Sequence, residues 1–143
     1  GPERLSPHAI IACGDAGNWQ MALDILRTTP YAKTNIVNCN SAMNALRKAE
    51  QWQHVLELLA DMKTARMKPD NKTYREAMNA CAGVAHWMMA LQFIDELQGV
   101  NDGPIWNVNY RFAMEACARA GYSDAALQLL SDMRKQKLEW NSQ

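Results

Sequence analysis

Among the side chains that could ligate a metal or act as nucleophiles are four cysteines and three histidines: Cys13, Cys39, Cys81, Cys117, His8, His54 and His86;. No two cysteines have Cys-x-x-Cys spacing, and the histidines share no ligand spacing with a cysteine or a carboxylate. No phosphate-binding loop or catalytic carboxylate pair is recognisable. The sequence therefore predicts no metal, no cofactor, no small-molecule substrate and no enzyme activity.

These cysteines and histidines lie within an internal sequence repeat. Its clearest copy spans residues 36–70. The segment AMNAL at 42–46 reappears as AMNAC at 77–81, as AMEAC at 113–117 and as AIIAC at 9–13, at intervals of 33, 35 and 36 residues. A second block follows each copy: WQMALDIL, WQHVLELL, WMMALQFI and SDAALQLL. A period of this size indicates stacked supersecondary units. We expect one array over residues 3–141, with units at about 3–35, 36–70, 71–106 and 107–141.

Each unit has the pattern of two helices. In the first helix the apolar residues fall at i, i+3, i+4 and i+7, as in Cys39, Ala42, Met43 and Leu46;. The second helix has a broad apolar face, and neither helix can bury its stripe alone. The pattern predicts helices over residues 6–13, 19–27, 38–48, 51–66, 73–83, 86–98, 109–120 and 123–136, with Pro7 in the first turn of the first helix.

Cysteine and tryptophan positions follow the repeat. Cys13, Cys81 and Cys117 occupy one position on the buried stripe, and Cys39 lies on the same stripe, so we expect free core thiols and a reducing compartment;. The tryptophans Trp19, Trp52 and Trp87 each begin a second helix. That shared place favours packing between units over a ligand-binding role.

Charge is balanced overall but unevenly distributed. Lys plus Arg and Asp plus Glu each number 15, so the net charge gives no bulk reason to expect a polyanion partner;. Basic residues gather on the predicted first helices, and acidic residues on the second helices. This segregation predicts a basic concave face that could hold an anionic strand, although an ordinary solvated face explains the same bias.

The sequence can also carry segments that direct a protein to a membrane or a compartment, and its first residues bear on the same question. No apolar run reaches the roughly 18 residues of a membrane span, and nothing resembles a signal peptide, so no membrane partner is expected. Gly1 and Pro2 resemble the scar of a protease used to remove a tag. If they are, the native N-terminus, with any transit peptide and further repeats, precedes this sequence.

The repeat resembles the pentatricopeptide repeat (PPR) family over nearly the whole chain. The resemblance rests on the 35-residue period, Tyr74 and Tyr110 opening first helices, the Ala-Gly turns at 16–17 and 120–121, and the Met-Lys-Pro-Asp that closes the unit at 67–70. Tetratricopeptide repeats differ, because they carry Trp in the first helix. The resemblance implies an all-α, right-handed α-solenoid of helix-turn-helix repeats that binds single-stranded RNA.

In that family each unit reads one base, chiefly through the fifth and last residues of the motif, while the second residue packs against the base. In the unit at 36–70 these are Asn40, Asp70 and Val37, and the first two resemble the family's uracil-selecting pair. An Asn amide offers a donor and an acceptor to a base edge, and a carboxylate can orient that amide. Local capping is the competing explanation for both residues.

The later units depart from this pattern. The corresponding residues are Lys72, Arg75 and Trp106 in the third unit, and Val108, Arg111 and Asn141 in the fourth. Arg in the fifth position fits no base-reading pair, so Arg75 and Arg111 are candidates for binding phosphate, stacking on bases or meeting an acidic protein. Trp106 and Trp140 lie outside the register of the other tryptophans and are candidates for stacking. Lys48 and Arg119 resemble backbone-contacting positions, with ordinary helix C-terminal charge as the alternative.

The leading prediction is a single-stranded RNA-binding repeat module. The family resemblance implies a role in organellar RNA metabolism, in a mitochondrion or plastid. The alternative is a protein-interaction scaffold whose Arg75 and Arg111 bind an acidic partner segment. A third hypothesis, the substrate-binding part of an RNA-processing enzyme, depends entirely on flanking sequence.

Overall fold

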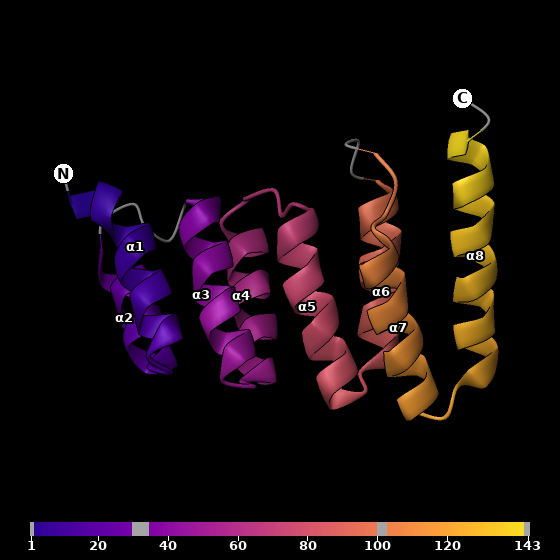
Figure 1. The fold of residues 1–143 in the computed structure, drawn as a ribbon, viewed down its shortest axis with the longest axis horizontal. Coiled ribbons are helices and arrows are strands. Elements are labelled where there is room, and N and C mark those ends of the chain that lie inside the picture. The colour runs from indigo at the N-terminus through magenta and orange to yellow at the C-terminus, as the bar shows by residue number, and fades with distance from the viewer. Residues whose placement is uncertain (1, 30–34, 100–102, 142–143) are drawn as a thin grey trace. The chain divides into compact units, whose positions relative to one another are not determined.

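The computed structural model of the protein describes residues 2–29, 35–99 and 103–141, with side chains within 8–29, 35–99 and 103–139. This part of the chain forms eight helices and no strand (Figure 1). They are α1 (Pro2–Asp15), α2 (Trp19–Thr28), α3 (Ile36–Lys48), α4 (Trp52–Thr64), α5 (Asn71–Val84), α6 (Trp87–Gln98), α7 (Asn107–Arg119) and α8 (Ser123–Asn141). The all-α helical repeat class is confirmed.

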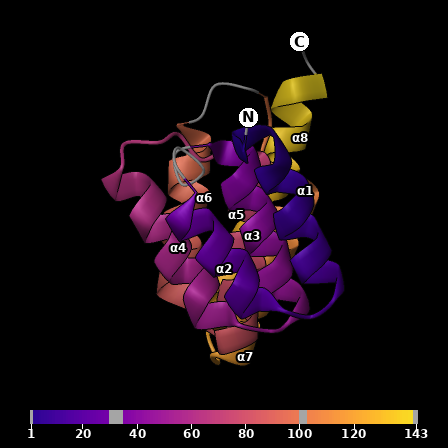
Figure 2. The ribbon, with the colours of Figure 1, turned by 90° about the vertical axis from the view of Figure 1, so that its left-hand side faces the viewer.

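The chain divides into two compact units, Gly1–Ala80 and Cys81–Gln143, with the division inside α5. In the first unit α1 packs on α2 and on α3, and α3 also contacts α4. Helices α1 and α3 lie side by side in Figure 2. In the second unit α7 packs between α6 and α8. The first helix of a pair therefore contacts its own partner helix and also a helix of a neighbouring pair. The right-handed winding of the array stays a prediction.

Small side chains let the first helices approach closely. A Cβ added to Gly14 of α1 would lie 3.0 Å from the Cβ of Ala45 in α3, so these two helices meet nearly backbone to backbone. Ala42, Met43 and Leu46 of α3 are fully buried, as the apolar stripe predicted. Removing such side chains from water is the main stabilising contribution, because a short helix is marginal alone.

The turn inside each helix pair uses one left-handed residue at a fixed repeat position. Gly17 and Gly121 have positive φ there, and so do Glu50 and Ala85, at 56° and 54°. Each turn is closed by a hydrogen bond from the amide of the following residue to a carbonyl five residues earlier, such as Gln51 N to Leu46 O at 2.9 Å;. The repeat geometry thus imposes on two non-glycine residues a conformation that glycine adopts without strain.

Helix boundaries differ from the sequence predictions mainly at the caps. Helices α3, α5 and α7 begin two residues earlier than predicted, because the last residue of the preceding repeat stands at the N-cap; in α3 the cap is Asn35, which accepts from Val37 N at 2.8 Å;. Helix α4 ends at Thr64 rather than residue 66, since Arg66 has positive φ. Helix α1 begins at Pro2, so Pro7 is not in its first turn, and α8 continues to Asn141.

The cysteines are free, as predicted, but they are not equally buried. Cys39, Cys81 and Cys117 are fully buried, whereas Cys13 is only half-buried. Burial raises the pKa of the Cys39 thiol to about 11 and that of Cys81 to about 12, so both stay protonated and packed as small apolar groups;.

Two of the tryptophans that begin second helices contact an aromatic ring of the following helix pair. Trp87 stacks on Tyr122 with ring centroids 4.0 Å apart, and Trp19 lies 4.8 Å from the ring of His54. These contacts agree with the packing role expected for this position.

Candidate nucleic-acid interface

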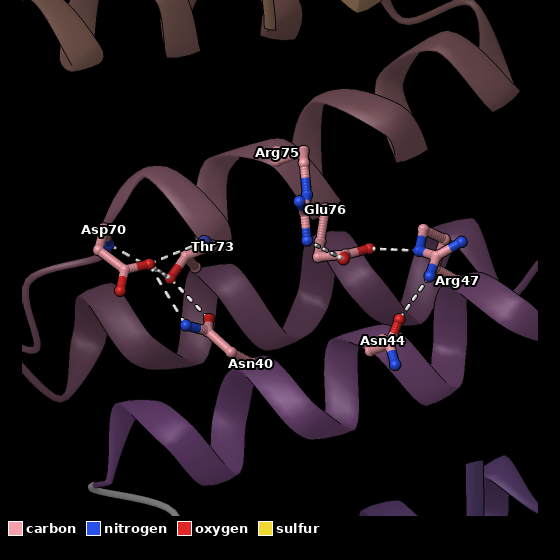
Figure 3. A network of polar contacts seen from close by, with 7 residues as sticks. All are labelled: Asn40, Asn44, Arg47, Asp70, Thr73, Arg75 and Glu76. Atoms are coloured by element: carbon pink, nitrogen blue, oxygen red, sulfur yellow. Dashed lines mark hydrogen bonds and ion pairs between the residues drawn. The ribbon is translucent and has the colours of Figure 1, made fainter. Parts of the chain in front are cut away.

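A polar network joins the middle of α3 to the start of α5 within the first unit (Figure 3). The Asn40 amide nitrogen donates to Asp70 Oδ1 at 3.3 Å, and the Asn40 amide oxygen lies 2.7 Å from the Thr73 hydroxyl, which donates to it. The same hydroxyl lies 2.8 Å from Asp70 Oδ1. Residues 30 and 33 positions apart are thus held in one cluster by the packing of the two helices.

Local capping builds the α5 side of this network. Asp70 Oδ1 accepts the backbone N–H of Thr73 at 2.9 Å, and the Thr73 hydroxyl accepts the backbone N–H of Asp70 at 3.2 Å. This reciprocal pair is a capping box, which satisfies two amides at the helix start. The capping explanation and the base-reading explanation therefore both apply to Asp70, and they do not exclude each other.

The network also fixes the charge of Asp70. Partial burial alone would raise the pKa of this carboxyl group. The hydrogen bonds from the Thr73 backbone, the Thr73 hydroxyl and the Asn40 amide, together with the positive charge of Lys72, outweigh burial, so the pKa lies below its ordinary value of 3.8;. Asp70 is consequently an anion at neutral pH and holds the amide nitrogen of Asn40 toward itself.

Asn40 keeps half of its hydrogen-bonding capacity for a ligand. A carboxamide has two N–H donors and two lone pairs on oxygen. One N–H goes to Asp70 and one lone pair receives the Thr73 hydroxyl, which leaves one donor and one acceptor on a half-buried side chain. A group that offers one donor beside one acceptor complements the Watson–Crick edge of a base.

An open pocket of about 390 Å³ lies beside this amide, and its size is that of many small-ligand sites;. Val37, whose side chain is 56% exposed, provides an apolar wall. Lys72 and Arg75 bring positive charge to the same pocket. The structure therefore brings together four residues singled out from the sequence: Val37, Asn40, Asp70 and Arg75.

A buried carboxylate organises the arginines at the other end of this pocket. Glu76 has a side chain only 4% exposed; its Oε2 forms an ion pair at 2.9 Å with Arg47 Nε, without the alignment of a hydrogen bond. Its Oε1 accepts from Arg75 at 3.5 Å, and Arg47 also donates to Asn44 (Figure 3). Two arginines around one carboxylate leave a local excess of one positive charge.

Sequence reasoning missed three of the residues that shape this region: Thr73, Glu76 and Arg47. The Asp-x-x-Thr spacing of a capping box was the signal for Thr73. Glu76 lies three residues later and so shares a helix face with Thr73, which places it toward α3. No sequence signal pointed to its pairing with Arg47, because their contact depends on how α3 and α5 pack.

The residues at the corresponding positions at the start of α7 have other side chains and other contacts. Trp106 stands at the N-cap of α7 without a side-chain capping bond, and its side chain is 37% exposed. Asn109 takes the place of Thr73 and is fully buried, and neither atom of its side-chain amide is hydrogen-bonded to a residue that the structure describes. Val108 is half-buried, and Arg111 is exposed with its guanidinium 5.4 Å from the Phe112 ring centre. The side chains of Trp140 and Asn141 lie outside the described residues.

Lys48 and Arg119, which the sequence predicts to contact the RNA backbone, each bond another residue of the protein. Lys48 forms an ion pair with Asp15 at 2.8 Å, and both side chains are well exposed. Arg119 donates to the carbonyl oxygen of Ala82 at 2.6 Å, near the C-terminal end of α5. The ion pairs of Lys48 with Asp15 and of Arg47 with Glu76 reduce the positive charge that the first helices present to a ligand, whereas Arg119 keeps its charge on a neutral carbonyl.

Metal sites and membrane-spanning helices are two other features that the described residues lack. No group of three or more His, Cys, Asp or Glu is arranged to hold a metal ion there. Among the helices of this described part, none is both long enough and apolar enough to cross a membrane.

Comparison with known families covers both units. The model of the PPR repeat family matches residues 34–83, a span that contains the complete network of Asn40, Asp70 and Thr73. The model of the PPR repeat matches residues 108–138, which hold most of α7 and of α8. The two matches together cover more than half of the sequence. No curated protein matches the chain.

Proposed function

Since the chain belongs to the pentatricopeptide repeat family, whose repeats generally bind RNA, we propose that it is a single-stranded RNA-binding module that reads a uracil beside Asn40. The observation that carries this proposal is the Asn40 amide, held by Asp70 and Thr73 at the wall of an open pocket. An amide in that position keeps a free donor and a free acceptor directed at whatever occupies the pocket.

The chemistry of the pocket suits a pyrimidine. Uracil presents an N3–H donor beside carbonyl acceptors, and these complement the free oxygen lone pair and the free N–H of Asn40. The exposed Val37 offers a stiff apolar surface for the face of the base;. Lys72 and Arg75 supply positive charge for the phosphate that follows the base;.

The proposed affinity is modest and most of it comes from the first unit. The chain has no net charge, and Arg47, Lys48 and Arg119 already have protein partners. Few phosphates would therefore be neutralised, and few counterions released. Arg111 and Trp106 in the second unit supply an exposed cation and an exposed ring for contact without a base code, since Trp106 stands at the repeat position that the Asp70 carboxylate has at α5;.

We further propose that the full-length protein acts in organellar RNA processing, editing, stability or translation, in a mitochondrion or plastid. This organellar role is supported only by the resemblance to the pentatricopeptide repeat family. Fluorescence microscopy of the tagged full-length protein tests it, and a signal confined to the cytosol would reject it.

Fluorescence anisotropy with short labelled U-, C-, A- and G-rich RNAs at two salt concentrations tests RNA binding itself. We expect the U-rich strand to bind tightest, and Asn40→Ala to lose about tenfold of that preference, which is the usual worth of one well-formed base contact. Arg75→Ala should weaken all four RNAs alike and lower the salt dependence by about one charge. Gln53→Ala, on the exposed surface of α4, is the matched control and should change nothing.

Two outcomes would contradict this proposal. If no RNA binds at low salt, the RNA-binding function is wrong for these residues, and a scaffold for an acidic protein segment becomes the better explanation. If RNA binds but Asn40→Ala keeps the full preference for uracil, the pocket grips the backbone and reads no base.

A further inference from the structure

We propose that Thr73 is a positioning residue that sets the pyrimidine preference of the pocket by locking the amide of Asn40 in one orientation. The inference rests on the proposed function, and it assigns to a residue outside the RNA contact surface a role in discriminating uracil from cytosine. Three observations carry it: the burial of Thr73, the number of hydrogens on its hydroxyl group, and the position of that group between two oxygens.

Burial excludes a direct role in recognition. Thr73 is fully buried at the first turn of α5, so RNA in the pocket cannot touch it. Any effect of this residue on base preference must act through Asn40 or Asp70, which its hydroxyl contacts at 2.7 and 2.8 Å. Both of these residues line the pocket, whereas Thr73 does not.

The hydroxyl has one hydrogen and two acceptors within reach. Its oxygen already accepts the backbone N–H of Asp70 at 3.2 Å, so its one hydrogen is shared between Asn40 Oδ1 and Asp70 Oδ1;. Asp70 Oδ1 also receives the Thr73 backbone N–H and the Asn40 amide. Asn40 Oδ1 has no comparable second donor within the network. The hydroxyl hydrogen is therefore the group that fixes the oxygen end of this amide.

Two contacts at opposite ends of the amide determine its orientation. Asp70 holds the nitrogen end at 3.3 Å, a long bond, and Thr73 holds the oxygen end at 2.7 Å, a short one;. Turning the amide over would bring its oxygen against the Asp70 carboxylate, and the short contact between the amide oxygen and the Thr73 hydroxyl hydrogen would be lost;. Without the hydroxyl, the long contact to Asp70 alone resists rotation.

A fixed amide discriminates pyrimidines, and a rotating amide does not. Uracil carries its donor at N3 between two carbonyl oxygens, whereas cytosine carries its donor on the exocyclic amino group with an acceptor at N3. The order of donor and acceptor along the base edge therefore differs between the two bases. An amide with one order selects one of them, and an amide free to reverse that order can bind either.

The experiment measures the ratio of Kd for C-rich RNA to Kd for U-rich RNA by anisotropy, in the wild type and in Thr73→Val, Thr73→Ala and Thr73→Ser. We expect a ratio of about ten in the wild type, a ratio near two or less in the Val and Ala variants, and recovery in Thr73→Ser, which restores the hydroxyl. Thr64→Val is the matched control, because Thr64 is exposed on α4 and its hydroxyl bonds only a local carbonyl. Its ratio should equal that of the wild type.

The possible failures are distinguishable. A wild-type ratio retained in both Thr73→Val and Thr73→Ala, with circular dichroism showing folded protein, would mean that Thr73 only caps α5 and that our inference is wrong. A methyl group against Asn40 Oδ1 can unfold the Val variant, and the Ala variant avoids that contact and decides the question alone. A wild type that binds no RNA would instead overturn the proposed function, and this inference with it.

Discussion

The starts of α5 and α7 occupy the same place in two consecutive repeats, and they differ in the polar contacts of their side chains. At α5, Asp70 caps the helix, and Thr73 is buried in a network with Asn40. At α7, Trp106 gives no side-chain cap, and the buried side-chain amide of Asn109 is hydrogen-bonded to no residue that the structure describes. The backbone of the repeat therefore fixes where these side chains stand, and their chemical types decide whether they form a site.

The carboxylate of Asp70 accounts for most of the difference between the starts of α5 and α7. A polar residue is buried at this repeat position in α3, α5 and α7 alike, as Asn38, Thr73 and Asn109. Thr73 has Asp70 three residues before it, and the two satisfy each other's amides. Asn109 has Trp106 at that place, whose side chain offers no acceptor. A buried polar group without a partner costs free energy of folding, so the same position stabilises one helix start and weakens the other.

The largest expected effect comes from Asp70→Ala, which removes the cap and the centre of the network together. We expect the free energy of unfolding to fall by about 2–3 kcal/mol, since a cap contributes about 1 kcal/mol and the Thr73 and Asn40 bonds a similar amount each. Urea denaturation followed by circular dichroism measures it.

The matched control is Asn35→Ala in α3. Asn35 caps its helix through the amides of Val37 and Asn38 alone, so this variant should lose only about 1 kcal/mol;. Equal losses in the two variants would show that the network adds nothing to the cap and would remove the contrast between α5 and α7.

A smaller effect of opposite sign is expected at the corresponding residue of α7. Asn109→Val replaces a buried, unbonded amide with an apolar side chain and should raise the free energy of unfolding by about 1 kcal/mol;. The same change in α5, Thr73→Val, should lower it, because there the polar group is bonded. Urea midpoints of the two variants compare the positions directly, and a loss of stability in Asn109→Val would mean that its amide has partners in solution.

The smallest expected effect is a pH dependence of the free energy of unfolding, which comes from Asp70 at the start of α5. The pKa of Asp70 is lower in the folded chain than its ordinary value of 3.8, so the unfolded state takes up the proton first;. Its stabilising contribution is complete above pH 3.8 and is lost as the pH falls through the folded value. Asp70→Asn keeps a capping side chain but does not titrate. The difference in unfolding free energy between wild type and this variant should shrink below pH 3.8, and a constant difference would contradict the assignment.

Much of the fold could be predicted because it depends on patterns along the chain. The apolar stripe of residues such as Ala42, Met43 and Leu46 predicted the buried face of α3, and all three are fully buried. Boundaries were less accurate where capping set them, as at Asn35 and Asp70. The left-handed turn residues Glu50 and Ala85 had no glycine to mark them, since the repeat geometry imposes their conformation.

The candidate site was predicted in part. The repeat register brought attention to Asn40, Asp70 and Val37, and all three line one pocket with Arg75. Thr73 and Glu76 were missed because their roles depend on a contact between helices. The ion pair of Lys48 with Asp15 and the hydrogen bond of Arg119 to the Ala82 carbonyl could not be predicted from the sequence either.

The sequence by itself determined the helical repeat, its register and its family, because period, apolar spacing and turn residues are properties of the chain alone;. Only the tertiary structure decided which polar groups meet. Asn40 finds Asp70 and Thr73 across some thirty residues because α3 packs against α5. The side-chain amide of Asn109, at the repeat position of Thr73, bonds none of the residues that the structure describes. Hydrogen bonds and ion pairs act over about 3 Å, and spacing along the sequence does not specify positions that closely.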